Sequence, residues 1–303
     1  MQHSRRSFIR QSGLALAAAS ILPRHLLAGG VARETLGIQL YSVRDDMKKD
    51  PAGTLEKLAQ MGYKNVEHAN YIDHKFYGYS QVDFKKLLDG LGLKMPSGHT
   101  RMNAEHWDAT KKDFTDDWKQ TVADAAAMGQ QYVISPWLDE SLRKNYDDLV
   151  RYMEVFNKSG ELCKKSGMKF GYHNHDFEFS VKLNDITVFD IILKNTDPSL
   201  VMQQLDIGNM YNAGAKALEI VNKYPGRFTS MHVKDEIKGT SANERYESTI
   251  LGKGILPVKE IIDLGRKSGG TTLFIIEQES YQGLTPIDCA KEDLKVINAW
   301  GYK

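Results

Sequence analysis

The chain has 303 residues, of which 41% are hydrophobic and 26% are charged, the balance of an ordinary globular protein. Its 40 basic and 39 acidic residues give a formal charge of +1, so no strong positive potential favours nucleic acid as a ligand. The mean hydropathy of −0.45 excludes a polytopic membrane protein. Two cysteines, Cys163 and Cys289, are too few for a disulfide framework or a cysteine zinc cluster.

The first thirty residues differ from the rest, because they hold arginines and no acidic residue. An apolar run at 13–22 follows the basic start, and a run of about ten is too short to span a bilayer. The segment SRRSFIR at 4–10 resembles the twin-arginine signal, which implies export of a folded protein to the periplasm. We expect residues 1–30 to be this signal, with no membrane association after its removal, and 31–303 to be the domain. The alternative is a basic amphipathic anchor that stays in place.

From residue 36 onward, amphipathic helices alternate with apolar strands. Helices expected at 54–61, 82–91, 116–128 and 146–166 each end near a glycine, which permits a left-handed turn into the next strand. A last helix is expected at 286–298. The expected strands cover residues 36–41, 63–68, 93–99, 131–135, 168–175, 200–206, 228–234 and 272–278.

Eight strand–helix units predict a parallel sheet closed into a single-domain (β/α)8 TIM barrel. The alternative is an open doubly wound sheet, which usually carries a glycine-rich turn after its first strand. The segment YSVRD at 41–45 stands there instead, so the barrel is favoured.

Polar side chains gather where the predicted strands end, which is where a barrel of this type carries its active site. Buried polar groups need partners, and nitrogen and oxygen donors from several rigid strands suit a divalent cation. Asp206, His232 and Glu277 occupy the same relative position on three consecutive strands. This recurrence favours a metal site over three unrelated core residues.

These positions resemble the sugar phosphate isomerase/epimerase superfamily of xylose-isomerase-like TIM barrels, over nearly all of 36–300. The family's strand-six, strand-seven and strand-eight patterns match as LDIGN at 205–209, MHVKD at 231–235 and IEQ at 276–278. A Gly-x-Gly segment before the seventh helix matches as GKG at 252–254.

Strand five departs from the family pattern. The family commonly reads Glu-Asn-His, with the Glu on the metal and the His on the substrate, whereas this chain reads HNH at 173–175. A neutral imidazole still ligates a cation, but the site loses one carboxylate. The resemblance then implies one divalent ion (Mn, Mg, Zn or Co) held by His173, Asp206, His232 and Glu277.

The same resemblance gives Glu277 an acid/base role in catalysis. With the strand-five Glu replaced, His175 is the first choice for a second acid/base, because imidazole titrates near neutral pH. Glu178 is the second choice, unless it is a surface residue. Further substrate contacts are expected from Tyr41, Glu67, His99, Trp137, Asn209 and Lys234. Rim packing explains the first four of these equally well, and surface ion pairing is the alternative for Lys234.

The expected reaction begins with removal of a proton beside a carbonyl, giving an enediolate that a divalent metal stabilises. The first hypothesis is a metal-dependent sugar isomerase or epimerase. The second is a metal-dependent lyase that cleaves 3-keto glycosides by β-elimination, which export and the missing strand-five Glu favour. A non-catalytic sugar-binding barrel is the third. An abasic-site endonuclease is disfavoured, because Asn209 stands where its metal-binding His is expected. The expected partner is a small sugar or glycoside, not nucleic acid, and a homo-oligomer is left open.

Overall fold

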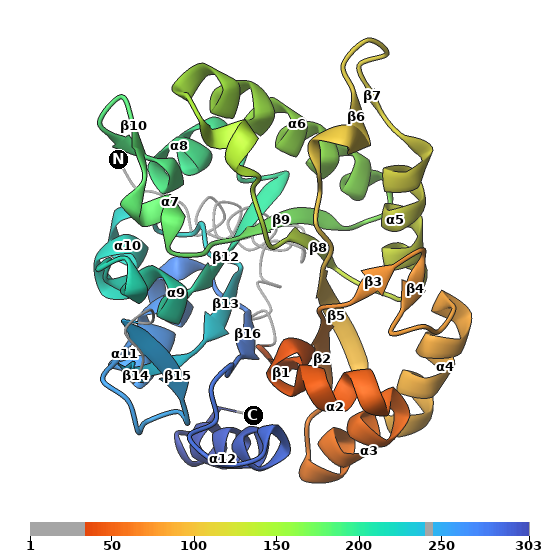
Figure 1. The fold of residues 1–303 in the computed structure, drawn as a ribbon, viewed down its shortest axis with the longest axis vertical. Coiled ribbons are helices and arrows are strands. Elements are labelled where there is room, and N and C mark those ends of the chain that lie inside the picture. Colours follow the sequence, from red (N-terminus) through yellow and green to blue (C-terminus); the bar gives the residue numbers. More distant parts are fainter. Residues whose placement is uncertain (1–33, 240–244, 303) are drawn as a thin grey trace, which may run out of the picture. The chain divides into compact units, whose positions relative to one another are not determined.

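The computed structural model describes residues 34–239 and 245–302 of the chain. Eight parallel strands close into a barrel in the order β1-β16-β13-β12-β9-β8-β5-β2, which confirms the predicted fold class (Figure 1). The barrel closes because β1 pairs in parallel with both β2 and β16. The strands are β1 (Thr35–Gln39), β2 (Asn65–His68), β5 (Lys94–His99), β8 (Tyr132–Ser135), β9 (Lys169–His173), β12 (Val201–Asp206), β13 (Ser230–Val233) and β16 (Leu273–Ile276).

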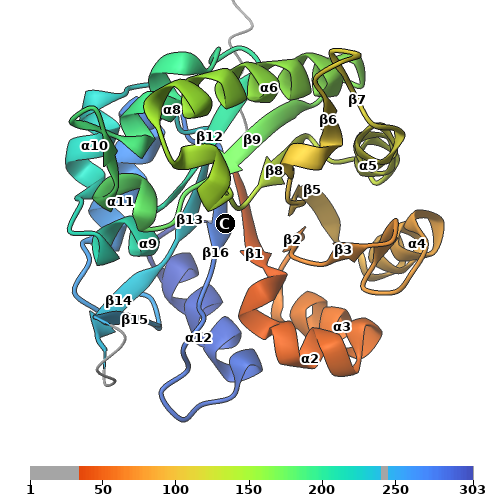
Figure 2. The ribbon, with the colours of Figure 1, turned by 45° about the horizontal axis from the view of Figure 1, so that its top comes forward.

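Helices cover the outside of the barrel on all sides (Figures 1 and 2). They are α2 (Arg44–Lys49), α3 (Pro51–Met61), α4 (Gln81–Leu91), α5 (Asp116–Ala127), α6 (Tyr146–Lys165), α7 (Phe177–Ser180), α8 (Val188–Asn195), α9 (Ile207–Asn212), α10 (Ala217–Lys223), α11 (Val258–Leu264) and α12 (Pro286–Ala299). None of these described helices is long and apolar enough to cross a membrane. The predicted export signal at 1–30 lies outside the described residues.

The helix ends follow local chemistry that the sequence carries. Gly62 and Gly92 end α3 and α4 with φ of 113° and 68°, a conformation that side chains disfavour. Helix α3 begins three residues before its expected start at 54, because the Asp50 side chain accepts the Gly53 N–H and caps it. The helices therefore lie where the periodicity predicts them, and caps adjust their ends.

The apolar core lies between the barrel and its helices in two clusters. One includes Leu205 and Met231 on β12 and β13, together with the inner faces of α3, α4, α11 and α12. The other includes Phe170 on β9, with Trp118 and Phe156 on α5 and α6. Because apolar contacts hold the helices on the outside, the inside of the barrel at its carboxyl end is free to carry polar side chains.

Strand β9 ends at His173, two residues before the expected end at 175. The Asn174 side chain accepts the Asp206 N–H at 3.0 Å and donates to the Asp206 carbonyl oxygen at 3.1 Å. This side chain takes over the pairing that a longer strand would make with β12. As a result, His175 lies in the loop before α7 and is free of the strand's in-and-out alternation.

Four short antiparallel pairs extend from the barrel as loops. They are β3–β4 (Tyr71–Ile72 with Lys75–Phe76), β6–β7 (Trp107–Asp108 with Asp113–Phe114), β10–β11 (Lys182–Leu183 with Ile186–Thr187) and β14–β15 (Asp235–Lys238 with Tyr246–Thr249). The β14–β15 pair directly follows β13 and lies beside α9 (Figures 1 and 2). It therefore brings residues beyond the strand ends to the mouth of the barrel.

Candidate active site

Three of the four predicted metal-binding residues converge at the carboxyl end of the barrel. Asp206 ends β12, His232 lies on β13 and Glu277 follows β16, and one donor atom of each lies within 4.8 Å of the others. His232 Nδ1 is 3.1 Å from Glu277 Oε2 and 3.7 Å from Asp206 Oδ2. All three side chains are buried, so their donor atoms are held away from bulk water.

The two oxygens of Asp206 have different environments. Oδ1 accepts the Asn209 N–H at 2.6 Å and caps the first turn of α9. Oδ2 lies 3.1 Å from Lys234 Nζ, within ion-pair distance, yet forms no directed hydrogen bond with any described residue. The helix cap therefore fixes the carboxylate, while its second oxygen keeps lone pairs for a cation.

His173 stands beside this group with one nitrogen available. Its Nδ1 donates to Gln204 Oε1 at 3.1 Å, which leaves the lone pair on Nε2, 3.9 Å from Asp206 Oδ2. Burial, reinforced by the neighbouring imidazoles, holds the pKa of His173 well below its usual value. A neutral imidazole in this orientation is a suitable metal ligand.

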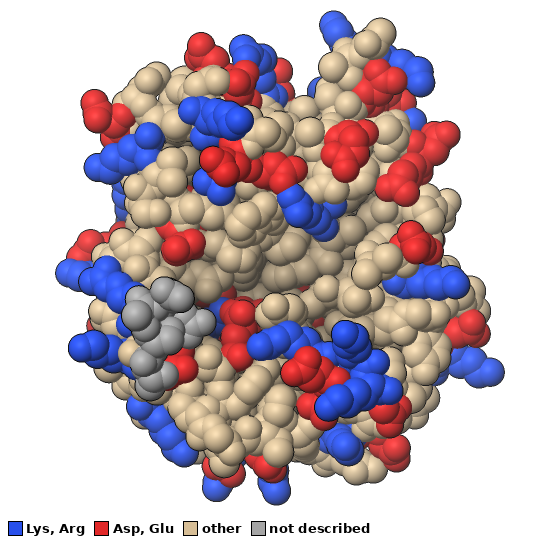
Figure 3. All heavy atoms as spheres, in the orientation of Figure 1, with Lys and Arg blue, Asp and Glu red and all other residues tan. Residues whose placement is uncertain are grey.

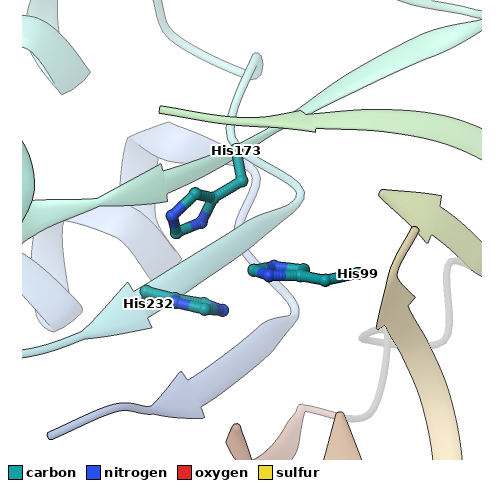
Figure 4. Close-up of side chains that lie close together, drawn as sticks. All are labelled: His99, His173 and His232. Atoms are coloured by element: carbon teal, nitrogen blue, oxygen red, sulfur yellow. The ribbon is translucent and has the colours of Figure 1, made fainter. Parts of the chain in front are cut away.

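His99, which was predicted only as a substrate contact, adds a third imidazole and completes a histidine cluster. His99, His173 and His232 come from β5, β9 and β13 and turn toward one another (Figure 4). The His99 ring stacks on His232 with centroids 5.2 Å apart and meets the edge of His173 at 4.8 Å. Ring nitrogens of the three lie within 4.8 Å of one another, so His99 is a further nitrogen donor near the metal set.

Glu67 contacts two histidines of this cluster, His232 and His99. It is fully buried and accepts His232 Nε2–H at 2.7 Å, Gln39 Nε2–H at 2.8 Å and Gln204 Nε2–H at 2.9 Å. Although burial alone would raise the pKa of Glu67, His99 and His232 hold it well below its usual value. The structure does not bring Glu67 to a cavity wall as a substrate contact, because its oxygens are occupied by these donors. Its partners place it behind the metal ligand His232.

Lys234 is buried, not a surface lysine. Its Nζ lies 2.8 Å from Glu277 Oε2 and 2.6 Å from Glu279 Oε1, in addition to its contact with Asp206. Despite burial, these carboxylates hold the pKa of Lys234 well above its usual value. The ammonium group therefore balances the negative charge of the predicted metal set.

Most predicted substrate contacts line a cavity of about 400 Å³ above the metal set. Figure 3 shows this face of the molecule hollowed near its centre, with acidic and basic side chains around the hollow. The predicted site residues on the wall are Tyr41, His99, Trp137, His173, His175, Asn209 and Glu277. Tyr71, Arg101 and Glu279 also line it and were missed. Glu279 could have been predicted as a site residue, because it follows Glu277 by two residues.

A second cavity of about 380 Å³ adjoins the first and shares His175, Asn209 and Glu279 with it. Lys234, the last of the predicted substrate contacts, lies on its wall. The β14–β15 pair supplies Glu236, Tyr246, Glu247 and Ser248 to the same wall. These four residues were not predicted as site residues, because they follow strand seven in a segment to which no role was assigned.

His175 lies between the two cavities, and Glu178 lies behind it. The His175 N–H donates to Glu178 Oε2 at 2.9 Å, and Tyr172 donates its hydroxyl to Glu178 Oε1. Glu178 is fully buried, and burial raises its pKa to about 8. It lines neither cavity, so the structure places it as a support for the His175 loop and not as an acid/base group or a surface residue. Burial lowers the pKa of His175 to about 4.

The donor set fits a divalent cation. Asp206 Oδ2 accepts no directed hydrogen bond from a described residue, His173 Nε2 lies 3.9 Å from it, and Glu277 adds a carboxylate. Nitrogen and oxygen donors of this kind are shared by Mn, Mg, Zn and Co sites to different degrees. If a cation took Asp206 and Glu277 as ligands, Lys234 would still have Glu279 as an ion-pair partner, 2.6 Å away.

Known proteins resemble this chain over most of its length. Residues 55–300 match the family model described as xylose isomerase-like TIM barrel. The chain is 25% identical over 271 residues to the inosose dehydratase of Clostridium beijerinckii, covering 82% of this chain and 84% of that protein. The crystal structure of a sugar phosphate isomerase/epimerase from Parabacteroides distasonis aligns with a TM-score of 0.75 and 26% identity, over 90% of this chain and 96% of that one. The IOLI protein with a binding zinc atom shares the fold, with a TM-score of 0.66 at 13% identity, over 88% of this chain and 97% of that one.

Proposed function

The chain belongs to the family of xylose isomerase-like TIM barrels, and from that premise we propose that it is a metal-dependent lyase. It removes a proton beside the carbonyl of a sugar-like or cyclic polyol substrate and expels an oxygen from the next carbon. The dehydratase name of the relative from Clostridium beijerinckii supports elimination. Elimination was the second hypothesis of the sequence analysis, and we now place it before isomerisation or epimerisation.

The distribution of carboxylates in the first cavity carries this choice. Its two carboxylate residues, Glu277 and Glu279, both come from the segment that follows β16. An epimerase must remove a proton from one face of a carbon and return one to the other, and the resembled family uses a strand-five Glu for this. Here His173 takes that place and Glu178 is turned away. Elimination needs only one base at the reacting carbon.

The chain's own residues fit this reaction. His173, Asp206, His232 and Glu277 would hold the divalent ion, which when bound polarises the substrate carbonyl. Zinc in the IOLI protein supports a metal in this fold, without identifying the ligands or the ion here. Glu277 accepts the proton, and the buried ammonium group of Lys234 stabilises negative charge that develops on the substrate oxygen. Tyr41 and Trp137 cover the apolar faces of the sugar ring.

Isomerisation or epimerisation is the second candidate, which the similarity to the Parabacteroides distasonis protein favours. A direct test is to incubate the protein with Mn²⁺ and either a 3-keto glycoside, an inosose or a free ketose in D2O. The lyase proposal expects an unsaturated ketone, seen by its ultraviolet absorption, with release of alcohol or water. Interconversion of ketoses with no unsaturated product would overturn it and support the second candidate.

A further inference from the structure

We propose that the second cavity binds the leaving-group half of the substrate and that Glu236 protonates the departing oxygen. This inference rests on the proposed lyase function and deepens it. The substrate class that it implies is a keto glycoside, in which the leaving group is an alcohol large enough to fill a cavity of its own. The first cavity then holds the keto sugar ring.

Continuity of the two cavities is the first observation. His175, Asn209 and Glu279 line both, so a single ligand can cross from one to the other without leaving the site. Each has a volume in the range of small-molecule pockets. A substrate with two linked parts can occupy both cavities, whereas a monosaccharide or cyclic polyol would fill only one of them.

Glu236 is the second observation. It is only 2% exposed and yet lies on the wall of the second cavity. Its Oε2 is buried without a hydrogen-bond partner in the described chain, which is rare and costly for a carboxyl oxygen. Its neighbour Asp235 accepts the Glu236 N–H at 2.9 Å and so fixes the backbone from which the side chain projects.

Gly208 lets Glu236 pack against the start of α9. A Cβ on Gly208 would lie 2.3 Å from Glu236 Oε1 and 2.5 Å from Lys234 Cδ, so only glycine leaves room for both side chains against α9. Gly208 is two residues from Asp206, a predicted metal ligand. The carboxyl group therefore lies against the first turn of α9, which Asp206 caps, on the side of the second cavity.

Electrostatics agree with a proton-donating role. Burial raises the pKa of Glu236 to about 8, against the opposing influence of Lys234. A carboxyl group with such a pKa carries its proton at neutral pH, which is what protonation of a departing oxygen needs.

The step balances without another reactant. Glu277 takes the proton from the carbon beside the carbonyl, and the electron pair of that C–H bond becomes the new C=C bond. The C–O bond to the neighbouring carbon breaks, and its oxygen takes the proton of Glu236. The products are an unsaturated ketone and a free alcohol, with Glu277 protonated and Glu236 ionised. Exchange of one proton with water restores both.

The test compares two 3-keto glycosides on the Mn²⁺-loaded protein, one with an alkyl alcohol and one with 4-nitrophenol as the leaving group. 4-Nitrophenolate is a weak base and departs without being protonated. An alkyl alcohol departs only if its oxygen receives a proton. Glu236→Gln is expected to lower kcat/KM for the alkyl glycoside by about 10²-fold and to change the nitrophenyl glycoside by less than about threefold. Glu219→Gln, in an exposed pair with Lys216 and on the wall of neither cavity, is the matched control and is expected to leave both within about threefold.

Equal loss on both substrates, or no loss on either, overturns the role of Glu236. If Glu236→Gln unfolds, as judged by its melting temperature, Glu236→Asp keeps the carboxyl group but draws it back by one methylene, so a smaller loss confined to the alkyl glycoside is required of it. Tyr246→Ala is expected to raise KM for a keto disaccharide and not for the methyl 3-keto glycoside; equal KM changes overturn the subsite. A wild-type protein that eliminates neither leaving group overturns the lyase function itself, which separates the two failures.

Discussion

Glu67 shows how one buried carboxylate can tune a metal ligand. His232 donates its Nε2 proton to Glu67, which leaves Nδ1 to face Glu277 and Asp206. A carboxylate behind a ligating histidine fixes the ring and raises its basicity, and loss of such a partner typically weakens metal binding 10- to 100-fold. We expect Glu67→Gln to weaken Mn²⁺ binding by about that factor, measured by competition with a chelator.

The control for this prediction is Ser97→Ala. It removes a hydroxyl group that donates to the other oxygen of Glu67 and leaves the His232 contact intact. Its effect on metal affinity is expected to be much smaller. Wild-type affinity in Glu67→Gln would contradict the role assigned to the carboxylate.

Lys234 competes with the metal for the same carboxylates. Its ammonium group lies 3.1 Å from Asp206 Oδ2 and 2.8 Å from Glu277 Oε2. Lys234→Met removes this charge, so the metal-free protein is expected to lose stability while metal affinity rises about tenfold, since a neighbouring positive charge no longer repels the ion. Turnover is expected to fall, because the developing negative charge loses its partner.

Titration calorimetry with Mn²⁺ and melting temperatures with and without the ion measure both effects. Lys216→Met is a suitable control, since Lys216 makes an exposed pair with Glu219 remote from this cluster. A weaker metal affinity in Lys234→Met would show that the lysine helps to hold the ion.

At the scale of elements, the Gly-x-Gly segment at 252–254 has a structural role. Asp235 Oδ2, at the start of β14, accepts the N–H groups of Gly252 and Gly254 at 2.8 and 2.9 Å. This ties the β14–β15 pair to the loop before α11. A Cβ on Gly254 would lie 2.1 Å from Asp235 Oδ1 and 2.5 Å from the Glu236 carbonyl oxygen, so the loop must shift to admit it.

Gly254→Ala is therefore expected to destabilise the fold by about 2 kcal/mol, as overpacking of a well-packed site does. Urea unfolding measures the change. Gly90→Ala is the matched control with the opposite sign, because a Cβ there meets nothing within 4 Å and Gly90 is an exposed position inside α4. Its expected effect is a gain of about 0.5 kcal/mol. An unchanged unfolding free energy in Gly254→Ala would show that the loop shifts easily and that its contacts with Asp235 add little stability.

The barrel was predictable because it depends on repeating patterns, whereas parts of the site depend on single side-chain contacts. Helix periodicity, glycine stops and eight apolar strands are each visible along the chain. The roles of Glu178 and Glu67 depend on which hydrogen-bond donors reach their oxygens. Tyr172 and His175 donate to Glu178, and His232 donates to Glu67. Glu236 could not be recognised, because its role comes from a loop folded back onto α9.

At the scale of the whole chain, we propose that residues 1–30 direct export through the twin-arginine route, to the periplasm. Replacing Arg5 and Arg6 by Lys keeps the charge and removes the residue type that the signal requires. The double variant is expected to remain in the cytoplasm, measured by cell fractionation. Arg10→Lys, outside the arginine pair, is the control and is expected to be exported. Export of the double variant would refute the route.

The pH dependence of global stability is expected to reflect Asp293. This residue of α12 is buried, accepts the Leu251 N–H at 2.9 Å, and has its pKa raised by burial to about 7. In the unfolded chain its pKa is near 3.8, so the native state holds a proton that the unfolded state has lost between about pH 4 and 7. The contribution of this group to stability is therefore fully present below about pH 4 and declines as pH rises to 7.

Asp293→Asn removes that decline, because an amide does not titrate. The unfolding free energy of Asp293→Asn relative to the wild type is expected to rise by about 4 kcal/mol from pH 4 to pH 8, since the pKa shift is about three units and each unit is worth about 1.4 kcal/mol. Urea unfolding of both proteins at the two pH values measures it. Subtracting the two curves cancels every other titrating group that the substitution leaves unchanged. A difference that stays constant with pH would mean that Asp293 is ionised in the folded protein.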